Sequence, residues 1–158
     1  MTLSDLEIVC FYHDKHKTGL GSLPLDSKPG QVIVTALNDN LDLLDQIKFC
    51  IMLSRPIGEE LGVVGTGSDL GFNAIILLND LIVCISSIKG RESNVEIRKL
   101  HAIDHIEISR TNSDSNVKLK FVANNQDPMQ VKYPCSMVDS VKPYIDDLRV
   151  AIRNSRNK

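Results

Sequence analysis

The chain has three groups of residues whose types and spacing could support chemistry, and the first lies near the N-terminus. Cys10, His13 and His16 are separated by two residues each, and both side-chain types bind zinc. Residues 6–12 have the composition of a β-strand, in which neighbouring side chains point to opposite faces. We therefore expect a strand end with exposed histidines and no metal site.

A second pair of histidines, His101 and His105, flanks Asp104 with a spacing of four residues. That spacing gathers metal ligands on one face of a helix. Here the segment is predicted to be extended, and residues four apart in a strand are separated by about 13 Å. The pattern thus predicts no metal centre, although either histidine alone could exchange a proton near neutral pH.

The third group is the glycine-rich segment 62–71, of the kind that can bring backbone amides close to a phosphate. A dinucleotide-binding loop needs a strand before it and a helix after it. A strand is predicted directly after this segment, from Phe72, and no Gly-Lys-Ser or Gly-Lys-Thr sequence is present. We expect a connecting loop here and, from the three groups together, a protein without catalytic residues, metal or cofactor.

Charge-based binding is the chemistry that the sequence favours. Two predicted strands, around residues 117–121 and 129–133, alternate apolar with polar side chains, so that one face is buried and the other meets solvent. Lys118, Lys120 and Lys132 fall on the solvent face. With Arg149 and Arg153 from the following helix, we expect these lysines to form a positive patch that contacts an acidic protein partner or anionic lipid.

The distribution of charge agrees with a basic binding face. The 158 residues carry a net charge of −2. Residues 1–85 contain 5 Lys and Arg against 11 Asp and Glu, a charge of −6, whereas residues 86–158 contain 13 against 9, a charge of +4. A basic half of this kind suits an acidic partner or a membrane surface. We expect no nucleic-acid partner.

The clearest secondary structure is predicted in the second half of the chain. Apolar runs at 74–78 and 81–85 are separated by Asn79 and Asp80, a two-residue connection typical of a β-hairpin. One or two further strands are predicted around 95–108, and they are followed by the two strands that carry the lysines. These strands should pair in antiparallel order.

A C-terminal helix is predicted where the apolar spacing changes after Pro134. Its apolar stripe runs from about Val141 to Ile152 and should pack against the sheet. Pro143 favours the later of two starts, because proline is tolerated in a first turn but removes a hydrogen bond from a helix interior. Ser136 or Ser140 would supply the N-cap.

The segment from residue 31 to residue 53 allows two interpretations of its second part. Residues 31–37 are β-like, and leucine and isoleucine spacing over residues 41–53 predicts a helix, which is the first interpretation. Ile47 and Ile51 also alternate with Lys48 and Cys50, as in a strand. The pattern alone leaves both interpretations open.

The order of these elements resembles the second half of a pleckstrin-homology-like domain of the GRAM or bacterial type. The resemblance rests on the hairpin around 78–81, the isoleucine-rich segment 100–108 and the helix 141–152, and it covers roughly residues 72–152. It implies an α+β fold in which an antiparallel sheet or partly open barrel is capped by a C-terminal helix. Residues 1–158 would form a single domain, with an N-terminal elaboration at 1–60, which has strands and, if residues 41–53 are helical, a helix, and the core at 72–154.

Two functions of different classes fit these features. The first is a non-enzymatic binding module that docks on a protein partner or an anionic membrane surface. The alternative is a small α+β adaptor or chaperone-like protein that acts as a homodimer through residues 41–53. No apolar run approaches the roughly 20 residues that span a bilayer, so we expect a cytoplasmic protein.

Overall fold

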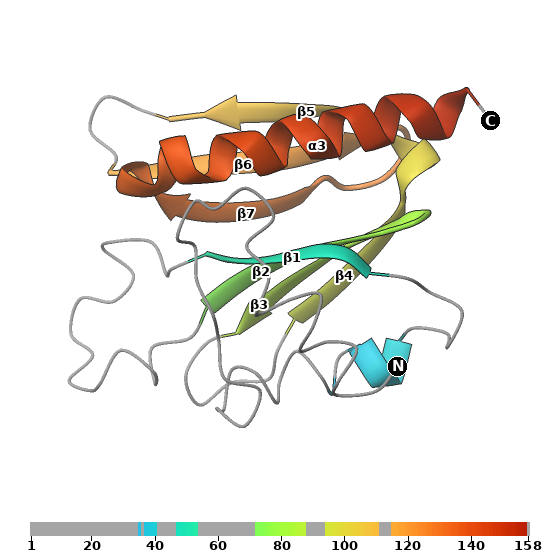
Figure 1. Ribbon diagram of the computed structural model, residues 1–158, viewed down its shortest axis with the longest axis horizontal. Coiled ribbons are helices and arrows are strands. Elements are labelled where there is room, and N and C mark those ends of the chain that lie inside the picture. Colours follow the sequence, from blue (N-terminus) through green and yellow to red (C-terminus); the bar gives the residue numbers. More distant parts are fainter. Residues whose placement is uncertain are drawn as a thin grey trace.

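Two antiparallel sheets and one long helix make up the computed structural model of this protein (Figure 1). The structure describes residues 35, 37–40, 47–53, 72–87, 94–110 and 115–157. Sheet A contains four strands in the order β1 (Ile47–Leu53), β2 (Phe72–Leu78), β3 (Leu81–Ser87) and β4 (Asn94–Lys99). Sheet B contains three strands in the order β5 (Ile103–Ser109), β6 (Asn116–Ala123) and β7 (Met129–Pro134).

The hairpin predicted around Asn79 and Asp80 is present and forms the centre of sheet A. β2 and β3 pair antiparallel, with Leu77 opposite Ile82 and Ala74 opposite Ile85. Both faces of this hairpin are apolar and buried. One face contributes to the main core, in a cluster with residues of sheet B, and the other carries Ile76, Leu78, Val83 and Ile85, each at most 1% exposed.

The chain passes from sheet A to sheet B through a short 3-10 turn, η3 (Leu100–Ala102). The Leu100 backbone N–H donates to the Asp80 carbonyl over 2.9 Å, which ties this turn to the β2–β3 hairpin. Leu100, the first residue of this turn, and Ile103, which follows it, are each 1% exposed. Burial of these two residues fixes where β5 begins. Strand β5 borders the site described below.

Sheet B has the alternation that the sequence predicts. Val117, Leu119 and Phe121 of β6 are buried, and they lie opposite Tyr133, Val131 and Met129 of β7. The turn between the two strands includes Asn125 with φ 60°, a conformation that asparagine tolerates better than most residues. The Asn73 side chain of sheet A donates to the Lys132 carbonyl over 2.9 Å, so that a hydrogen bond joins the two sheets.

Helix α3 (Val138–Arg156) covers the inner face of sheet B. Its buried side chains form one stripe and join the core cluster of both sheets: Val141, Tyr144, Ile145, Leu148 and Ile152. This is the stripe that the apolar spacing predicts. Because α3 occupies the inner face, the other face of sheet B is left for solvent.

Two predictions about the start of the C-terminal helix are wrong: its first residue and its N-cap. Helix α3 begins at Val138, directly after the 3-10 turn η4 (Cys135–Met137), and Pro143 lies inside the helix beyond its first turn. The N-cap is Met137, which makes no side-chain capping hydrogen bond, so neither Ser136 nor Ser140 has that role. Burial of Val141 and Tyr144 in the core explains why the helix continues through the proline, since tertiary packing overrides local preference.

The predicted helix over residues 41–53 is also wrong where it overlaps Ile47–Leu53, which form strand β1. The alternative interpretation as a strand is confirmed. Pairing with β2 satisfies the backbone, and Ile51 and Leu53 are buried in the core, 2% and 1% exposed, so sheet packing outweighs helical spacing. Thr35 and Leu37 are helical, which corrects the end of the β-like run 31–37; Leu37 is buried, and tertiary context decides such short segments.

The expected fold class is confirmed: the protein is α+β, with antiparallel sheets and a helix at the C-terminal end. In the described ranges the two sheets are separate and do not close into a barrel. The strand predicted over 6–12, the Cys10–His16 group and the glycine-rich segment 62–71 lie outside the described residues.

Candidate functional site

The three lysines predicted to share a solvent face do share one. Lys118 on β6 lies directly opposite Lys132 on β7, and Lys120 follows two positions along β6, opposite Gln130. Since side chains alternate along a strand and the residues between these lysines are buried on the inner face, the lysines project to the outer face. We call Lys118, Lys120 and Lys132 the lysine face.

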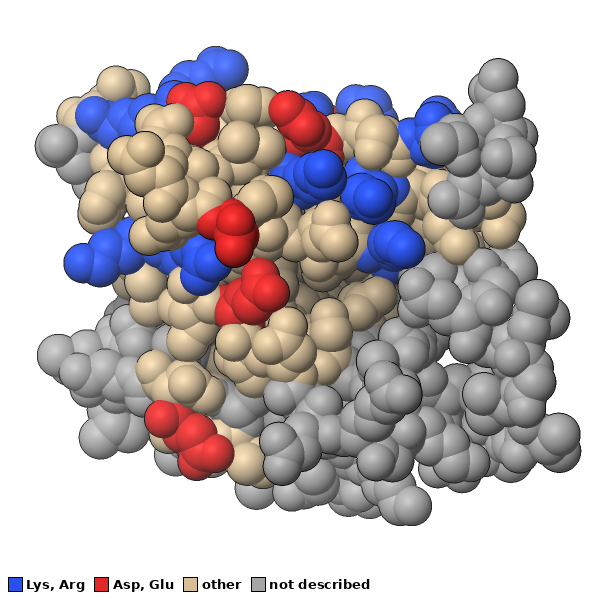
Figure 2. Space-filling view, turned by 180° about the vertical axis from the view of Figure 1, so that it is seen from behind, with Lys and Arg blue, Asp and Glu red and all other residues tan. Residues whose placement is uncertain are grey.

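The lysine face is an open surface on the side of sheet B that turns away from α3. Figure 2 shows that face, on which lysine and arginine side chains gather over the upper half with single acidic side chains among them. Within the described parts of the chain, Lys118 and Lys120 make no hydrogen bond or ion pair. Their charges are therefore available to a partner.

Strand β5 continues this face on the other side of β6. Glu107 lies opposite Lys120, and Ser109 lies opposite Lys118. Directly opposed residues in an antiparallel pair lie about 4.5–5.5 Å apart at Cβ, so Glu107 partly offsets the charge of Lys120. The sequence patterns did not place Glu107 beside the lysines, because strand register is not visible in alternation alone.

Arg149 and Arg153 lie in an adjoining groove rather than on the lysine face. The groove, about 260 Å³ in volume, runs between α3 and β5, and its other lining residues are Asp104, His105, Ile106, Ile152 and Arg156. Arg149 lies 3.8 Å from the Asp146 carboxylate on its own helix. The structure thus brings the three lysines together and separates them from the two arginines by strand β5. A binding role for any of the five stays a prediction.

His105 links the groove to the lysine face, and sequence reasoning missed its partners. Its Nδ1 lies 2.6 Å from the Asp104 carboxylate and its Nε2 lies 2.9 Å from the Glu107 carboxylate. These hydrogen bonds, with Glu107 contributing most and Asp104 next, raise the pKa of His105 above its ordinary value of 6.5. The sequence held one signal for these contacts: Asp104 lies one position before His105, and Glu107 lies two positions after it.

Arg156 near the end of α3 anchors the start of β5. Its Nη2 donates to the backbone carbonyls of Ile103 and Asp104, and lies 3.8 Å from the Asp104 carboxylate. The residues are more than 50 positions apart in the chain, which is why sequence patterns could not find this contact. Arg156 therefore connects the end of α3 to the start of β5 at the edge of the groove.

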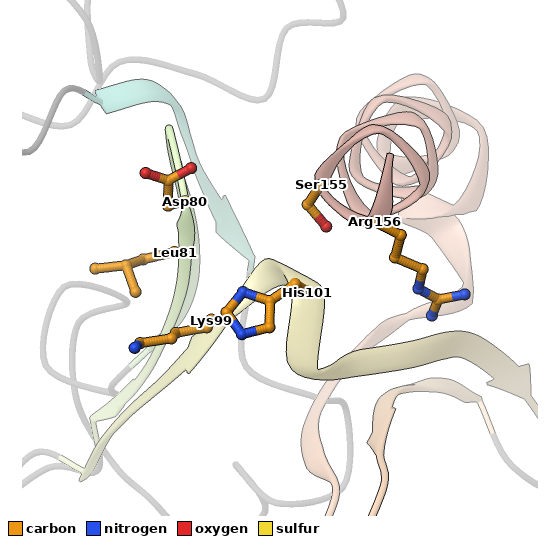
Figure 3. A pocket seen from close by; sticks show the side chains of 6 residues that line it. All are labelled: Asp80, Leu81, Lys99, His101, Ser155 and Arg156. Atoms are coloured by element: carbon orange, nitrogen blue, oxygen red, sulfur yellow. The ribbon is translucent and has the colours of Figure 1, made fainter. Parts of the chain in front are cut away.

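A second pocket opens where the β2–β3 turn, η3 and the end of α3 meet (Figure 3). It has a volume of about 730 Å³ and is lined by Asp80, Leu81, Lys99, His101, Ser155 and Arg156. In Figure 3 the side chains of Lys99 and Arg156 point away from each other, so the two cations do not converge on one point. Because the residues that line this pocket differ in charge and the two cations do not converge on one point, the pocket indicates no particular class of ligand.

His101 and His105 do not form a metal-binding pair. His101 lies in the turn η3, whereas His105 lies on β5 with both ring nitrogens bonded to carboxylates. Among the described residues, no group of three or more His, Cys, Asp or Glu side chains is arranged to hold a metal ion. The absence of a metal from the whole chain stays a prediction.

Two groups in the core have pKa values that burial shifts. Burial raises the pKa of the Cys84 thiol far above its ordinary range, with a smaller contribution from Glu96. Burial also raises the pKa of Tyr133. Both groups are therefore protonated at neutral pH and contribute packing. A reactive cysteine requires the thiolate, so Cys84 is a structural residue.

The similarity of this chain to known proteins is confined to its fold. No protein-family model matches it, and no curated protein sequence does. The crystal structure of a DUF1696 family protein with a pleckstrin-homology domain from Shewanella loihica is 16% identical; 75% of this chain and 95% of that chain are covered, with a TM-score of 0.46. The crystal structure of a pleckstrin-homology domain from Shewanella amazonensis is 11% identical. The similarity covers 76% of this chain and 86% of that chain, with a TM-score of 0.47.

Both solved structures contain a pleckstrin-homology domain, and their likeness to this chain is one of fold alone. What this chain binds does not follow from that similarity. As for membrane insertion, none of the helices in the described ranges combines the length and the apolar character needed to cross a bilayer.

Proposed function

We propose that this protein is a non-enzymatic binding module that docks on a negatively charged surface through the lysine face. The observation that carries the proposal is the register of sheet B, which sets Lys118 opposite Lys132 and places Lys120 beside them on the solvent side. Helix α3 occupies the other side of the sheet, so the lysines are presented outward.

An anionic membrane suits this face better than an acidic protein does. Protein interfaces take most of their binding energy from tryptophan, tyrosine and arginine side chains seated in pockets. The lysine face offers compact ammonium charges on an open sheet, and such charges attract anionic lipid without requiring a fixed geometry. Each lysine near an anionic membrane contributes about 1 kcal/mol, so binding should be weak and sensitive to salt.

Vesicle flotation tests the proposal. The protein should float with vesicles of phosphatidylcholine that contain phosphatidylglycerol, at low salt, and should stay behind with phosphatidylcholine alone. The triple substitution Lys118→Glu, Lys120→Glu, Lys132→Glu should abolish flotation and leave the circular dichroism spectrum unchanged, because the three side chains are half-buried on the outer face of the sheet and are not part of the core cluster. Equal flotation of the triple variant would contradict the proposal.

A protein partner is the other outcome that the same variants can reveal. Polyglutamate serves as the probe, since it carries carboxylate charge without a bilayer. If polyglutamate binds in a manner that depends on the lysine face while anionic vesicles do not, the partner is an acidic protein and the membrane proposal is wrong.

The alternative function is a dimeric adaptor whose interface was expected in residues 41–53. Residues 47–53 form strand β1 within sheet A, and Ile51 and Leu53 are buried in the core of the same chain. A homodimer therefore stays a prediction.

A further inference from the structure

His105 and Glu107 border the lysine face, so a proton on His105 changes the charge of that face. The register of sheet B places His105 opposite Val122 and Glu107 opposite Lys120, so His105 lies one strand away from Lys118 and Lys120 and two strands away from Lys132. Neighbouring strands lie about 4.8 Å apart, whereas the Debye length is about 8 Å at physiological ionic strength. The charge of His105 therefore acts on a partner that contacts the lysine face.

The two hydrogen bonds of His105 require its charged form. A carboxylate accepts hydrogen bonds and donates none, whereas a neutral imidazole has one donor nitrogen and one acceptor nitrogen. Nδ1 faces the Asp104 carboxylate at 2.6 Å and Nε2 faces the Glu107 carboxylate at 2.9 Å. Both bonds form together only when both nitrogens carry protons. Loss of one proton must break or weaken one of them.

Charged groups on three elements face His105. Asp104 and Glu107 on β5 favour its proton. Lys120 on β6, opposite Glu107, and the arginines that line the groove from α3, which are Arg149, Arg153 and Arg156, oppose it. The hydrogen bonds to Glu107 and then to Asp104 are the largest causes acting on the ring, and they raise the pKa of His105.

We infer that protonation of His105 regulates docking of the lysine face, with tighter binding to an anionic membrane when His105 is charged. This inference rests on the proposed function of the lysine face. Protonation of His105 adds one positive charge beside the lysine face, whatever the fixed charges of the lysines, carboxylates and arginines around it. One charge near an anionic membrane changes affinity about fivefold.

Vesicle binding at two pH values tests the inference. Phosphatidylglycerol vesicles are suitable because their phosphodiester charge is constant near neutral pH. Wild-type affinity should fall about fivefold between about pH 6 and about pH 8, across the range in which a histidine titrates. His105→Gln should bind at both pH values like the wild type at high pH, and His105→Lys like the wild type at low pH. His101→Gln, an exposed histidine away from this face, should keep the wild-type response.

The outcomes separate the two proposals. A pH response that survives in His105→Gln, or wild-type binding that is equal at both pH values, overturns the role of His105 and leaves docking by the lysine face intact. Binding that persists in the Lys118, Lys120 and Lys132 triple variant overturns docking itself. Circular dichroism of each variant excludes unfolding as the cause, and His105 is 48% exposed, so its replacement leaves the core unchanged.

Discussion

Lys118 on β6 and Lys132 on β7 lie directly opposite each other, so the sheet holds two like charges at its closest cross-strand spacing. Opposed like charges destabilise a sheet, by up to about 1 kcal/mol relative to a neutral pair. A protein under selection for stability alone would not need this arrangement. The pairing is therefore consistent with a face that is kept positive for binding.

Replacing one member of that pair by an acidic residue should stabilise the protein and weaken its binding to vesicles. Lys118→Glu places a carboxylate opposite Lys132, and an opposite-charge pair contributes about 0.2–1 kcal/mol. We expect the free energy of unfolding, measured by urea titration, to rise by a few tenths of a kcal/mol or more, and vesicle binding to fall. Lys99→Glu, at an exposed position on β4, is the control with the same charge change. A Lys118→Glu variant less stable than this control would contradict the account.

Helix α3 should depend on Leu148 for its attachment to the sheets. Leu148 is fully buried in the core cluster, so Leu148→Ala should lower the free energy of unfolding by about 2–5 kcal/mol. Val150→Ala is the matched control on the same helix, because Val150 is 54% exposed. Urea unfolding compares the two. Similar losses for both variants would mean that the helix does not pack as described.

Sequence patterns predicted most of this fold because its strands and helix have regular apolar spacing. Val117, Leu119 and Phe121 alternate with lysines, and Ile145, Leu148 and Ile152 form one helical stripe, so both burial patterns follow from spacing alone. Residues 47–53 have spacing that suits a helix and a strand equally. Pairing with β2, a contact with residues 20 or more positions away, decides the outcome.

The candidate site was predicted only in part, for a related reason. Alternation placed Lys118, Lys120 and Lys132 on one face, as the structure confirms. Arg149 and Arg153 were expected beside them, but both line the groove between α3 and β5. The packing of the helix on the sheet depends on contacts between residues far apart in the chain, which local spacing does not reveal. Glu107 and His105 came to the face through strand register, which local sequence does not encode.

Arg156 should contribute to stability through its two carbonyl contacts. Arg156→Ala removes hydrogen bonds from a charged donor to Ile103 and Asp104. Because the side chain is 43% exposed, solvent weakens these hydrogen bonds. We expect Arg156→Ala to lower the free energy of unfolding by about 1 kcal/mol. Arg153→Ala is the control, since Arg153 makes no ion pair with another described residue. Thermal unfolding of both variants measures the difference, and an unchanged Arg156→Ala would refute the anchoring role.

The pKa of His105 is accessible to NMR titration of the imidazole resonances. It should lie above the ordinary value of 6.5, and Glu107→Gln should lower it, because the Glu107 hydrogen bond is the largest cause of the shift. Since the folded-state pKa is raised, the contribution of His105 to stability is present below the unfolded-state pKa. It is lost as the pH rises through the folded-state pKa. A His105 pKa below 6.5 would show that the two carboxylates do not hold the ring.

The measurement that tests docking most directly compares two triple variants of equal charge. One carries Lys118→Glu, Lys120→Glu and Lys132→Glu on the lysine face; the other carries Lys48→Glu, Lys99→Glu and Lys142→Glu at exposed positions elsewhere. Both lower the net charge by the same amount, so a long-range effect of total charge would weaken vesicle binding equally in both. We predict that phosphatidylglycerol vesicles capture the second variant and not the first. Equal loss of binding in the two variants would contradict a specific role for the lysine face.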